Sequence, residues 1–206
     1  MVNLLVNNKM TIRRRIGIYG GSFNPIHNGH IALARQIQRQ ACLDEVWMMV
    51  SPQNPLKQGD NDLLDDQLRW EMTCEALKDE PGLRACDVEL QLPKPSYTWH
   101  TLQVLERQYP DEAFTLVIGA DNWQLFPRWY HSNDILKRYP VVVYPREGYP
   151  IKQNDLPENV LLMDTELYLV SSTDIRRRIR EGLPIDQLVP KAIAARATRY
   201  YQTQPT

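Results

Sequence analysis

Long apolar runs are missing from this sequence, and none approaches the length of a membrane-spanning helix. The first residues, MVNLLVNNKM, also lack a basic segment followed by a long apolar core, so the sequence predicts no signal peptide. We therefore expect a cytoplasmic protein without a membrane partner. Residues 1–12 are expected to form a poorly ordered N-terminal extension, in which Met10 is a second candidate start.

Cysteines are also few. The chain has three, Cys42, Cys74 and Cys86, and no two of them form a C-x-x-C motif. This spacing gives no sign of a zinc or redox centre. We expect free, buried thiols that act as small apolar side chains.

Neither sign of charge dominates the composition. The formal net charge is −1, with acids and bases interspersed, so we expect no nucleic-acid partner. No cluster of carboxylates indicates a metal held by protein ligands, and none is predicted. With 206 residues and no repeat or linker, residues 1–206 should form one domain. Whether the chain forms a homo-oligomer stays open.

One stretch, RIGIYGGSFNPIHNGH, combines three features of a phosphate site. Residues 15–19 are apolar and typical of a buried strand, and Gly20, Gly21, Ser22, Asn24 and Pro25 then break any regular pattern. A helical pattern begins after Asn28. A strand, a glycine turn and a helix together present backbone N–H groups and a positive helix end to a phosphate.

Two histidines, His27 and His30, stand three residues apart at the start of this helix, so they share one side of it. Each can donate a hydrogen bond to a phosphate oxygen. The stretch lacks the spacing of the dinucleotide fingerprint and the Lys-Ser/Thr of the P-loop. A plain glycine turn with two surface histidines is the alternative, but it does not account for all these features together.

The remaining chain alternates between strand and helix patterns. Apolar runs predict strands over Glu45–Val50, Arg84–Leu92, Phe114–Ile118, Val141–Tyr144, Val160–Met163 and Tyr168–Val170. Helices are predicted from Leu64, over Trp99–Gln108 with Thr98 as N-cap, over Asn133–Arg138, over Thr173–Glu181 capped by Ser172 or Thr173, and from Pro190. This alternation predicts an α/β fold with a Rossmann-like, doubly wound, mostly parallel sheet and helices on both faces.

Several polar or aromatic candidates follow these strands, and therefore belong to the carboxyl edge of the sheet, where such folds bind ligands. Lys57 is the long cation of a polar loop at this edge, and the alternative is an ordinary solvated lysine. Asp121 can bind ribose hydroxyls or cap a helix, and Thr98 can cap its helix and also touch a ligand. Trp129 can stack on a planar ring or belong to the core.

GGSFNPIHNGH resembles the first signature of nucleotidyltransferases with an H/T-x-G-H motif, and VSSTDIRRR resembles their second. NPLK, KPSYTWHTL, IGADNWQLFPRWY and PREGYP resemble, in order and spacing, segments of the bacterial nicotinate-nucleotide adenylyltransferases. The resemblance covers about residues 16–200. It implies adenylyl transfer from ATP to nicotinate mononucleotide, which gives deamido-NAD and pyrophosphate in NAD biosynthesis.

The resemblance also implies roles for particular residues. Backbone groups of Gly20, Gly21, Ser22 and Phe23 would contact the nucleotides, His27 and His30 the ATP phosphates, Lys57 the phosphates from its loop, and Ser172, Thr173 and Arg176 the β- and γ-phosphates. Mg²⁺ would bridge phosphate oxygens with few protein ligands. For the mononucleotide, the implied residues are Asn24, Thr98, Trp129, Tyr130 and Arg146, with Asp121 on a ribose hydroxyl.

Three positions depart from the family pattern. Asn24 replaces the usual Asp before the proline, which removes a charge beside the phosphates and leaves a positional role. His100 replaces the Asp of S-Y-T-x-D-T, and Leu56 stands where a histidine is common. Two rival functions stay open: an adenylyltransferase for nicotinamide mononucleotide or pantetheine phosphate, and a nucleotide-binding regulator without catalysis.

Overall fold

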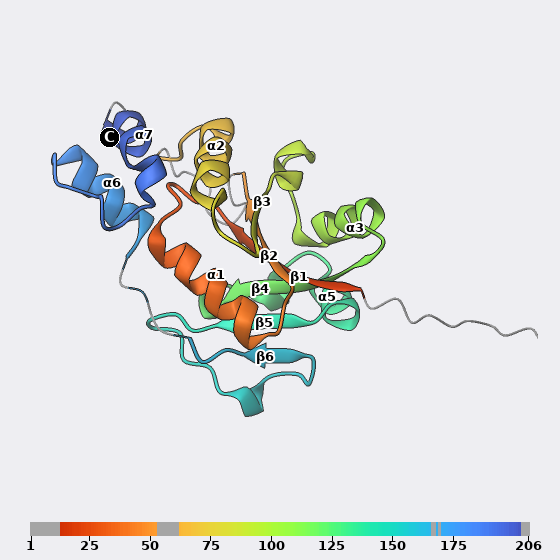
Figure 1. The fold of residues 1–206 in the computed structure, drawn as a ribbon. Helices are drawn as coiled ribbons and strands as arrows, with labels where there is room; N and C mark the ends of the chain where they lie inside the picture. Colours follow the sequence, from red (N-terminus) through yellow and green to blue (C-terminus); the bar gives the residue numbers. More distant parts are fainter. Residues whose placement is uncertain (1–12, 53–61, 166–167, 169, 203–206) are drawn as a thin grey trace, which may run out of the picture.

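The computed structural model describes residues 13–52, 62–165, 168 and 170–202. Its centre is a sheet of six parallel strands (Figure 1) in the order β3-β2-β1-β4-β5-β6. The strands are β1 (Arg14–Gly21), β2 (Glu45–Val50), β3 (Leu83–Cys86), β4 (Glu112–Gly119), β5 (Val141–Tyr144) and β6 (Val160–Leu162). The Rossmann-like α/β fold is confirmed, and the sheet is wholly parallel.

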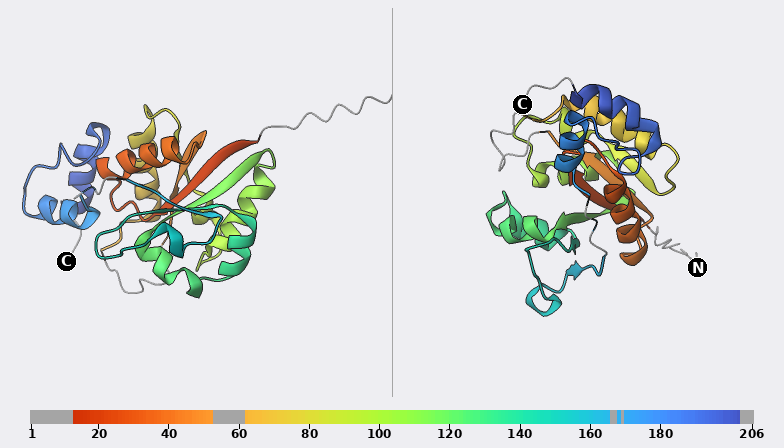
Figure 2. Two further views of the ribbon diagram at one scale, coloured as in Figure 1. Left: turned by 90° about the horizontal axis from the view of Figure 1, so that it is seen from below. Right: turned by 90° about the vertical axis from the view of Figure 1, so that its left-hand side faces the viewer.

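Helices cover both faces of the sheet, because its strands are apolar on both sides. In β1, Ile16 and Ile18 point to one core cluster and Tyr19 to the other. The Tyr19 cluster is covered by α1 (Asn28–Gln40), α2 (Asp66–Leu77), α6 (Ser172–Arg180) and α7 (Lys191–Gln202). The opposite cluster is covered by α3 (Thr98–Gln108), α4 (Ala120–Leu125) and α5 (Ser132–Arg138), and Figure 2 shows these layers from two further sides.

The predicted strand Arg84–Leu92 is wrong in its second half. Strand β3 ends at Cys86, and the 3-10 helix η1 (Val88–Gln91) follows. Val88 and Leu92 pack against one core cluster and Leu90 against the other. The apolar alternation is therefore real, but it comes from a tight turn at the sheet edge that places its side chains in both clusters. Two further 3-10 turns are η2 (Phe126–Arg128) and η3 (Gln153–Asp155).

Two predicted helix caps are also wrong. Tyr97, not Thr98, is the N-cap of α3, and Thr98 is the first helical residue. Ser171 caps α6, where its hydroxyl accepts from the Asp174 N–H at 3.1 Å. In both places the N-cap lies one or two residues before the side chain that a propensity argument selects.

The predicted strand Tyr168–Val170 is not found at either of its described residues, Tyr168 and Val170. Only one cysteine is buried as predicted, since Cys42 is exposed and Cys74 half-buried while Cys86 lies in the core. The expected N-terminal extension lies outside the described residues.

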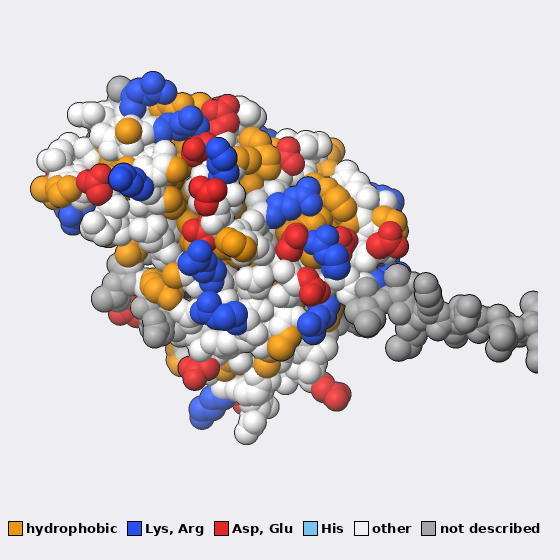
Figure 3. Space-filling view, in the orientation of Figure 1, with side chains coloured by type: hydrophobic (Ala, Val, Ile, Leu, Met, Phe, Trp, Pro, Cys, Tyr) orange, Lys and Arg blue, Asp and Glu red, His pale blue; other side chains and the backbone are white. Residues whose placement is uncertain are grey.

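Surface charge and helix length are two further features of the described residues. On the face drawn in Figure 3, Lys and Arg side chains are interspersed with Asp and Glu. Across the described ranges, every helix is too short or too polar to traverse a lipid bilayer.

Arg69 of α2 is fully buried and joins three loops beneath the sheet edge. Its Nε donates to the Leu64 carbonyl at 2.9 Å, and its Nη1 donates to the carbonyls of Ser51, at 2.9 Å, and Ser22. Asp66, 2.5 Å from its Nη2, balances the charge. A buried guanidinium suits this place because it offers five donors in fixed directions to several carbonyls.

We expect Arg69→Met to lower the free energy of unfolding by about 3–5 kcal/mol, because it leaves three carbonyls and Asp66 without their donor. Lys94→Ala is the control, because Lys94 reaches the same Asp66 from an exposed position. Its cost should stay below about 1 kcal/mol. Urea denaturation measures both, and equal losses would contradict the assignment.

Candidate functional site

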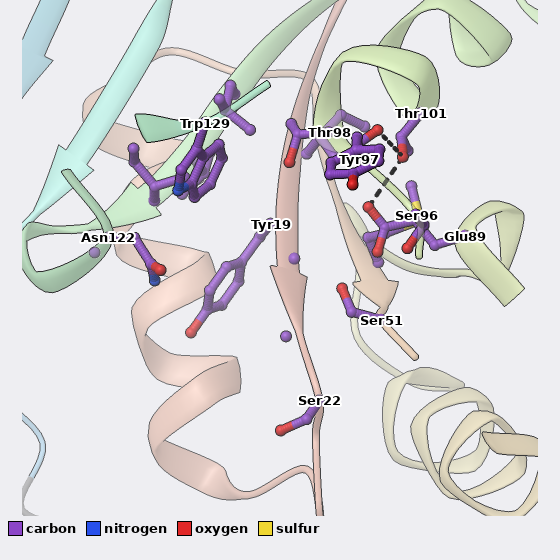
Figure 4. Close-up of a pocket in the computed structure, with 18 of the residues that line it drawn as sticks. Tyr19, Ser22, Ser51, Glu89, Ser96, Tyr97, Thr98, Thr101, Asn122 and Trp129 are labelled. Carbon is purple, nitrogen blue, oxygen red and sulfur yellow. Dashed lines mark hydrogen bonds between the residues drawn. The ribbon is translucent and has the colours of Figure 1, made fainter. Parts of the chain in front are cut away.

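A cavity of about 350 Å³ opens at the carboxyl ends of β1, β2, β4 and β5 (Figure 4). This is where parallel α/β sheets bind ligands, and the volume suits a small molecule. Its wall includes ten of the predicted site residues: Gly20, Gly21, Ser22, Phe23, His30, Thr98, Asp121, Trp129, Tyr130 and Arg146.

Five predicted residues do not line this cavity. They are Asn24, His27, Ser172, Thr173 and Arg176. His27, Ser172 and Arg176 contact the start of α1 or the backbone of the glycine turn, the Asn24 side chain points from that turn to α7 and to residues 62 and 64, and Thr173 is exposed on α6. Lys57 and Leu56 lie outside the described residues.

The two histidines cap α1 reciprocally. His27 Nδ1 accepts from the His30 N–H at 3.3 Å, and His30 Nδ1 accepts from the His27 N–H at 3.2 Å. This is a capping box built from two imidazoles. The rings stack with centroids 3.6 Å apart. Because each Nδ1 is an acceptor, each neutral ring carries its proton on Nε2, which leaves two Nε2–H donors.

Their environment keeps both rings neutral. Burial lowers the pKa of His27 from about 6.5 to about 4, and the charge of Arg146 acts in the same direction. Burial lowers the pKa of His30 well below its ordinary value, with further contributions from His27 and Arg146. Tyr19 and Phe23 set their rings edge-on around His30. The capping box acts in the same direction, because a protonated Nδ1 could not accept its backbone N–H.

Asp121 and Arg146 form a second polar group in the wall. Arg146 Nε lies 3.6 Å from Asp121 Oδ1, and Arg146 Nη2 donates to the Tyr144 hydroxyl at 3.3 Å. Gly119 makes room for this pair, because a Cβ there would lie 2.4 Å from Asp121 Oδ1. About half of the Arg146 side chain is exposed (49%), so it can reach a bound anion from the rim.

Aromatic rings form the opposite wall. Trp129 follows η2 and packs against Phe126, with ring centroids 5.3 Å apart. Its Nε1 atom is buried without a hydrogen-bond partner among the described residues. Tyr130 is 47% exposed and packs near Tyr97 and His100, at 5.0 and 5.3 Å between centroids. His100, which replaces the Asp of the family pattern, thus adds a ring to the aromatic rim formed with Tyr97 and Tyr130.

The start of α6 is tied to the glycine turn rather than open. Ser172 Oγ donates to the Pro25 carbonyl at 2.9 Å, and Arg176 Nη1 donates to the Asn24 carbonyl at 2.9 Å. Arg176 Nε also pairs with Asp62 Oδ2 at 2.7 Å. In this structure Arg176 is therefore bound to a carboxylate and is almost fully buried.

The Asn24 side chain is also committed within the protein. Its Oδ1 accepts from the Tyr201 hydroxyl at 2.7 Å and the Leu64 N–H at 3.1 Å, and its Nδ2 donates to the Asp62 carbonyl at 2.8 Å. An amide satisfies all three because it offers both acceptor and donor. Asn24 thus has a positional role in this structure.

Sequence reasoning missed several residues of the wall, among them Ser51, Glu89 and Tyr144. Two of them could have been found, because Ser51 directly follows β2 and Tyr144 ends β5. No local signal identifies Glu89, since its position depends on the unpredicted turn η1.

The fold and this cavity define a nucleotide-binding type of α/β protein. A model of the cytidylyltransferase-like family matches residues 18–178. A "probable nicotinate-nucleotide adenylyltransferase" of Bacteroides thetaiotaomicron is 47% identical over 167 residues, 81% of this chain and 82% of the relative. A protein of Bacteroides fragilis with the same description is 42% identical over 184 residues, which are 89% of this chain and 91% of the relative.

Among solved structures, Plasmodium falciparum nicotinic acid mononucleotide adenylyltransferase complexed with NaAD matches with a TM-score of 0.71. The match covers 91% of this chain and 98% of the Plasmodium chain at 16% sequence identity, which shows a shared fold. The chain therefore belongs to the cytidylyltransferase-like family and, within it, to the nicotinate-nucleotide adenylyltransferases. The resemblance predicted from the signatures is confirmed.

The low pKa of His27 makes stability depend on pH. Between about pH 4 and 6.5 the unfolded chain binds more protons than the folded one, so the free energy of unfolding should fall as pH is lowered through this window. His27→Asn keeps a good N-cap and removes the titrating ring. It should reduce the slope by up to about 1.4 kcal/mol per pH unit.

Urea denaturation of both proteins at several pH values measures this slope. If the variant kept the wild-type slope, burial of a neutral His27 would not be its source.

Proposed function

We propose that this chain transfers the adenylyl group of ATP to the phosphate of nicotinate mononucleotide and so forms deamido-NAD and pyrophosphate in NAD biosynthesis. One observation carries this: a single cavity joins a helix start with two histidines, suited to phosphates, to an aromatic wall suited to a planar ring. The two Bacteroides relatives, described as probable nicotinate-nucleotide adenylyltransferases, support the same reaction.

The phosphate end needs no side-chain nucleophile, because the acceptor phosphate is itself nucleophilic. Catalysis then consists of positioning and of stabilising negative charge in the transition state. We assign His30, in the wall, to the α-phosphate through Nε2–H, and His27 behind it to the same phosphates. Backbone groups of Gly20, Gly21, Ser22 and Phe23 line the path of the nucleotides.

Arg176 would bind the β- and γ-phosphates by exchanging its partner. It pairs with the Asp62 carboxylate in this structure, so a phosphate must displace that carboxylate to bind Arg176. Ser172 and Thr173 at the start of α6 are assigned to the same phosphates, and Lys57 to a position over them.

The aromatic end would hold the mononucleotide. Trp129 stacks on the pyridine ring, while Thr98 and the backbone around Tyr130 receive its carboxylate. Asp121 takes a ribose hydroxyl, and Arg146 takes the phosphate or the carboxylate from the rim. Asn24 acts indirectly, by holding the turn between the two ends.

Mg²⁺ enters on the ATP phosphates, whose oxygens supply most of its ligands. Among the described residues, no group of three or more His, Cys, Asp or Glu side chains could hold a metal ion.

The direct test is pyrophosphate release from ATP and Mg²⁺ with different acceptors. We expect turnover with nicotinate mononucleotide at least about tenfold faster, in kcat/KM, than with nicotinamide mononucleotide, a difference of about 1.4 kcal/mol. Turnover with pantetheine phosphate instead would keep the phosphate site and reject the aromatic pocket. No turnover with any acceptor would favour a regulator that binds nucleotides.

Two variants separate the ends of the cavity. His30→Ala should lower kcat about a hundredfold or more, because one lost contact to the developing charge costs about 3 kcal/mol. Trp129→Ala should instead raise KM for the mononucleotide much more than KM for ATP, because it removes a stacking surface. A His30→Ala enzyme with a near-normal rate, or equal KM effects in Trp129→Ala, would contradict these roles.

A further inference from the structure

Two arginines of α6, Arg176 and Arg180, share one carboxylate. Arg176 Nε lies 2.7 Å and Arg180 Nη2 lies 3.3 Å from the same oxygen, Asp62 Oδ2. Neither arginine pairs with a second acid within the described part of the chain, and no donor there bonds to Asp62 Oδ1. Two positive charges therefore face one negative charge through a single oxygen.

This ion-paired group adjoins the phosphate end of the cavity. Asn24 Nδ2 donates to the Asp62 carbonyl at 2.8 Å, which holds Asp62 against the glycine turn. The next residue, Leu63, lines the cavity together with Ser22. Figure 1 shows α6 beside the start of α1, where the two capping histidines lie. A phosphate bound by those histidines would therefore lie on the same side of the turn as the two arginines.

The carboxylate leaves the arginines incompletely bonded. Charge-assisted N–H···O bonds are ordinarily about 2.7–2.9 Å long, so the 3.3 Å contact of Arg180 is a weak one. A terminal phosphate carries up to two negative charges and three acceptor oxygens. It can accept from each guanidinium at a separate oxygen, whereas Asp62 offers both arginines the same one. An arginine fork is suited to this multidentate contact.

We propose that Arg180 forms, with Arg176, a subsite for a terminal phosphate of ATP, and that Asp62 occupies this subsite as an intramolecular anion until the phosphate displaces it. Displacement costs free energy, so Asp62 lowers the affinity for ATP. This inference rests on the function proposed above and deepens it, because it adds two residues to the group that distinguishes a triphosphate from a monophosphate.

Binding of ATP and of AMP to the free enzyme tests the subsite, because AMP lacks the terminal phosphates. In isothermal titration calorimetry with Mg²⁺, we expect Arg180→Gln to raise the Kd for ATP about tenfold, which is about 1.4 kcal/mol. Asp62→Asn should lower the Kd for ATP by a similar factor, because a neutral amide competes less well for the arginines. The Kd for AMP should stay unchanged in both variants.

Arg177→Gln is the matched control on the same helix. Arg177 is exposed, and its two ends lie 2.6 Å from Asp174 and 2.6 Å from Glu181, so its charge is already balanced. This variant should keep the wild-type Kd for both nucleotides. If it weakened ATP binding as much as Arg180→Gln does, the effect would come from the overall charge of α6, and the subsite would be rejected.

Thermal unfolding without nucleotide separates this subsite from a purely structural ion pair. Asp62→Asn should unfold at a lower temperature than the wild type, because it leaves two arginines without their counter-ion, and yet it should bind ATP more tightly. Lower stability with unchanged or weaker ATP binding would overturn the proposal. An equal loss of ATP and AMP binding in Arg180→Gln would also overturn it.

These measurements need neither an acceptor nor turnover. The expected pattern of ATP and AMP binding in a protein that does not use nicotinate mononucleotide would reject only the function proposed above. Conversely, if the wild type and Asp62→Asn both bound ATP no more tightly than AMP, the subsite would be rejected even in an active enzyme.

Discussion

The reciprocal hydrogen bonds between His27 and His30 are the constraint on which the site depends. They close the first turn of α1, fix both ring planes and determine which ring nitrogen carries the proton. A Ser or Asp cap would satisfy the helix equally well but would provide no stacked pair of N–H donors. Capping and the phosphate recognition proposed above would therefore use the two nitrogens of the same ring, so that neither could change without the other.

The turn that leads to this cap is held from three helices distant in sequence. Arg69 of α2 binds the Ser22 carbonyl, Arg176 of α6 binds the Asn24 carbonyl, and Tyr201 of α7 binds the Asn24 side chain. A glycine turn alone would sample many conformations. Because its carbonyls face inward to these donors, the turn is fixed beside the Nε2–H donors of His27 and His30. Fixed polar groups of this kind stabilise a transition state without reorganisation.

The sequence pattern predicted the features that depend on residues adjacent in the chain. The buried strands β1, β2, β4 and β5 were found because both of their faces are apolar, and the phosphate turn because glycines, proline and histidines occur together. Four predictions were wrong: a strand through Leu92, helix caps at Thr98 and at Ser172 or Thr173, and a buried Cys42. These features depend on how the sheet edge and the helix starts pack, which residue spacing does not record. Glu89 could not be found, because three segments meet around it only after folding.

Charge is distributed unevenly along the cavity. Burial, together with the charge of Arg146 at the rim, lowers the pKa of both histidines and keeps them neutral. At the other end, hydroxyls surround a single carboxyl group without a cation. Because the capping box holds each Nδ1 as an acceptor, each neutral histidine has its Nε2–H as the donor available for an anion. The two ends thus differ in chemistry: one offers neutral N–H donors with the charge of Arg146 at the rim, and the other offers hydroxyl groups and aromatic rings.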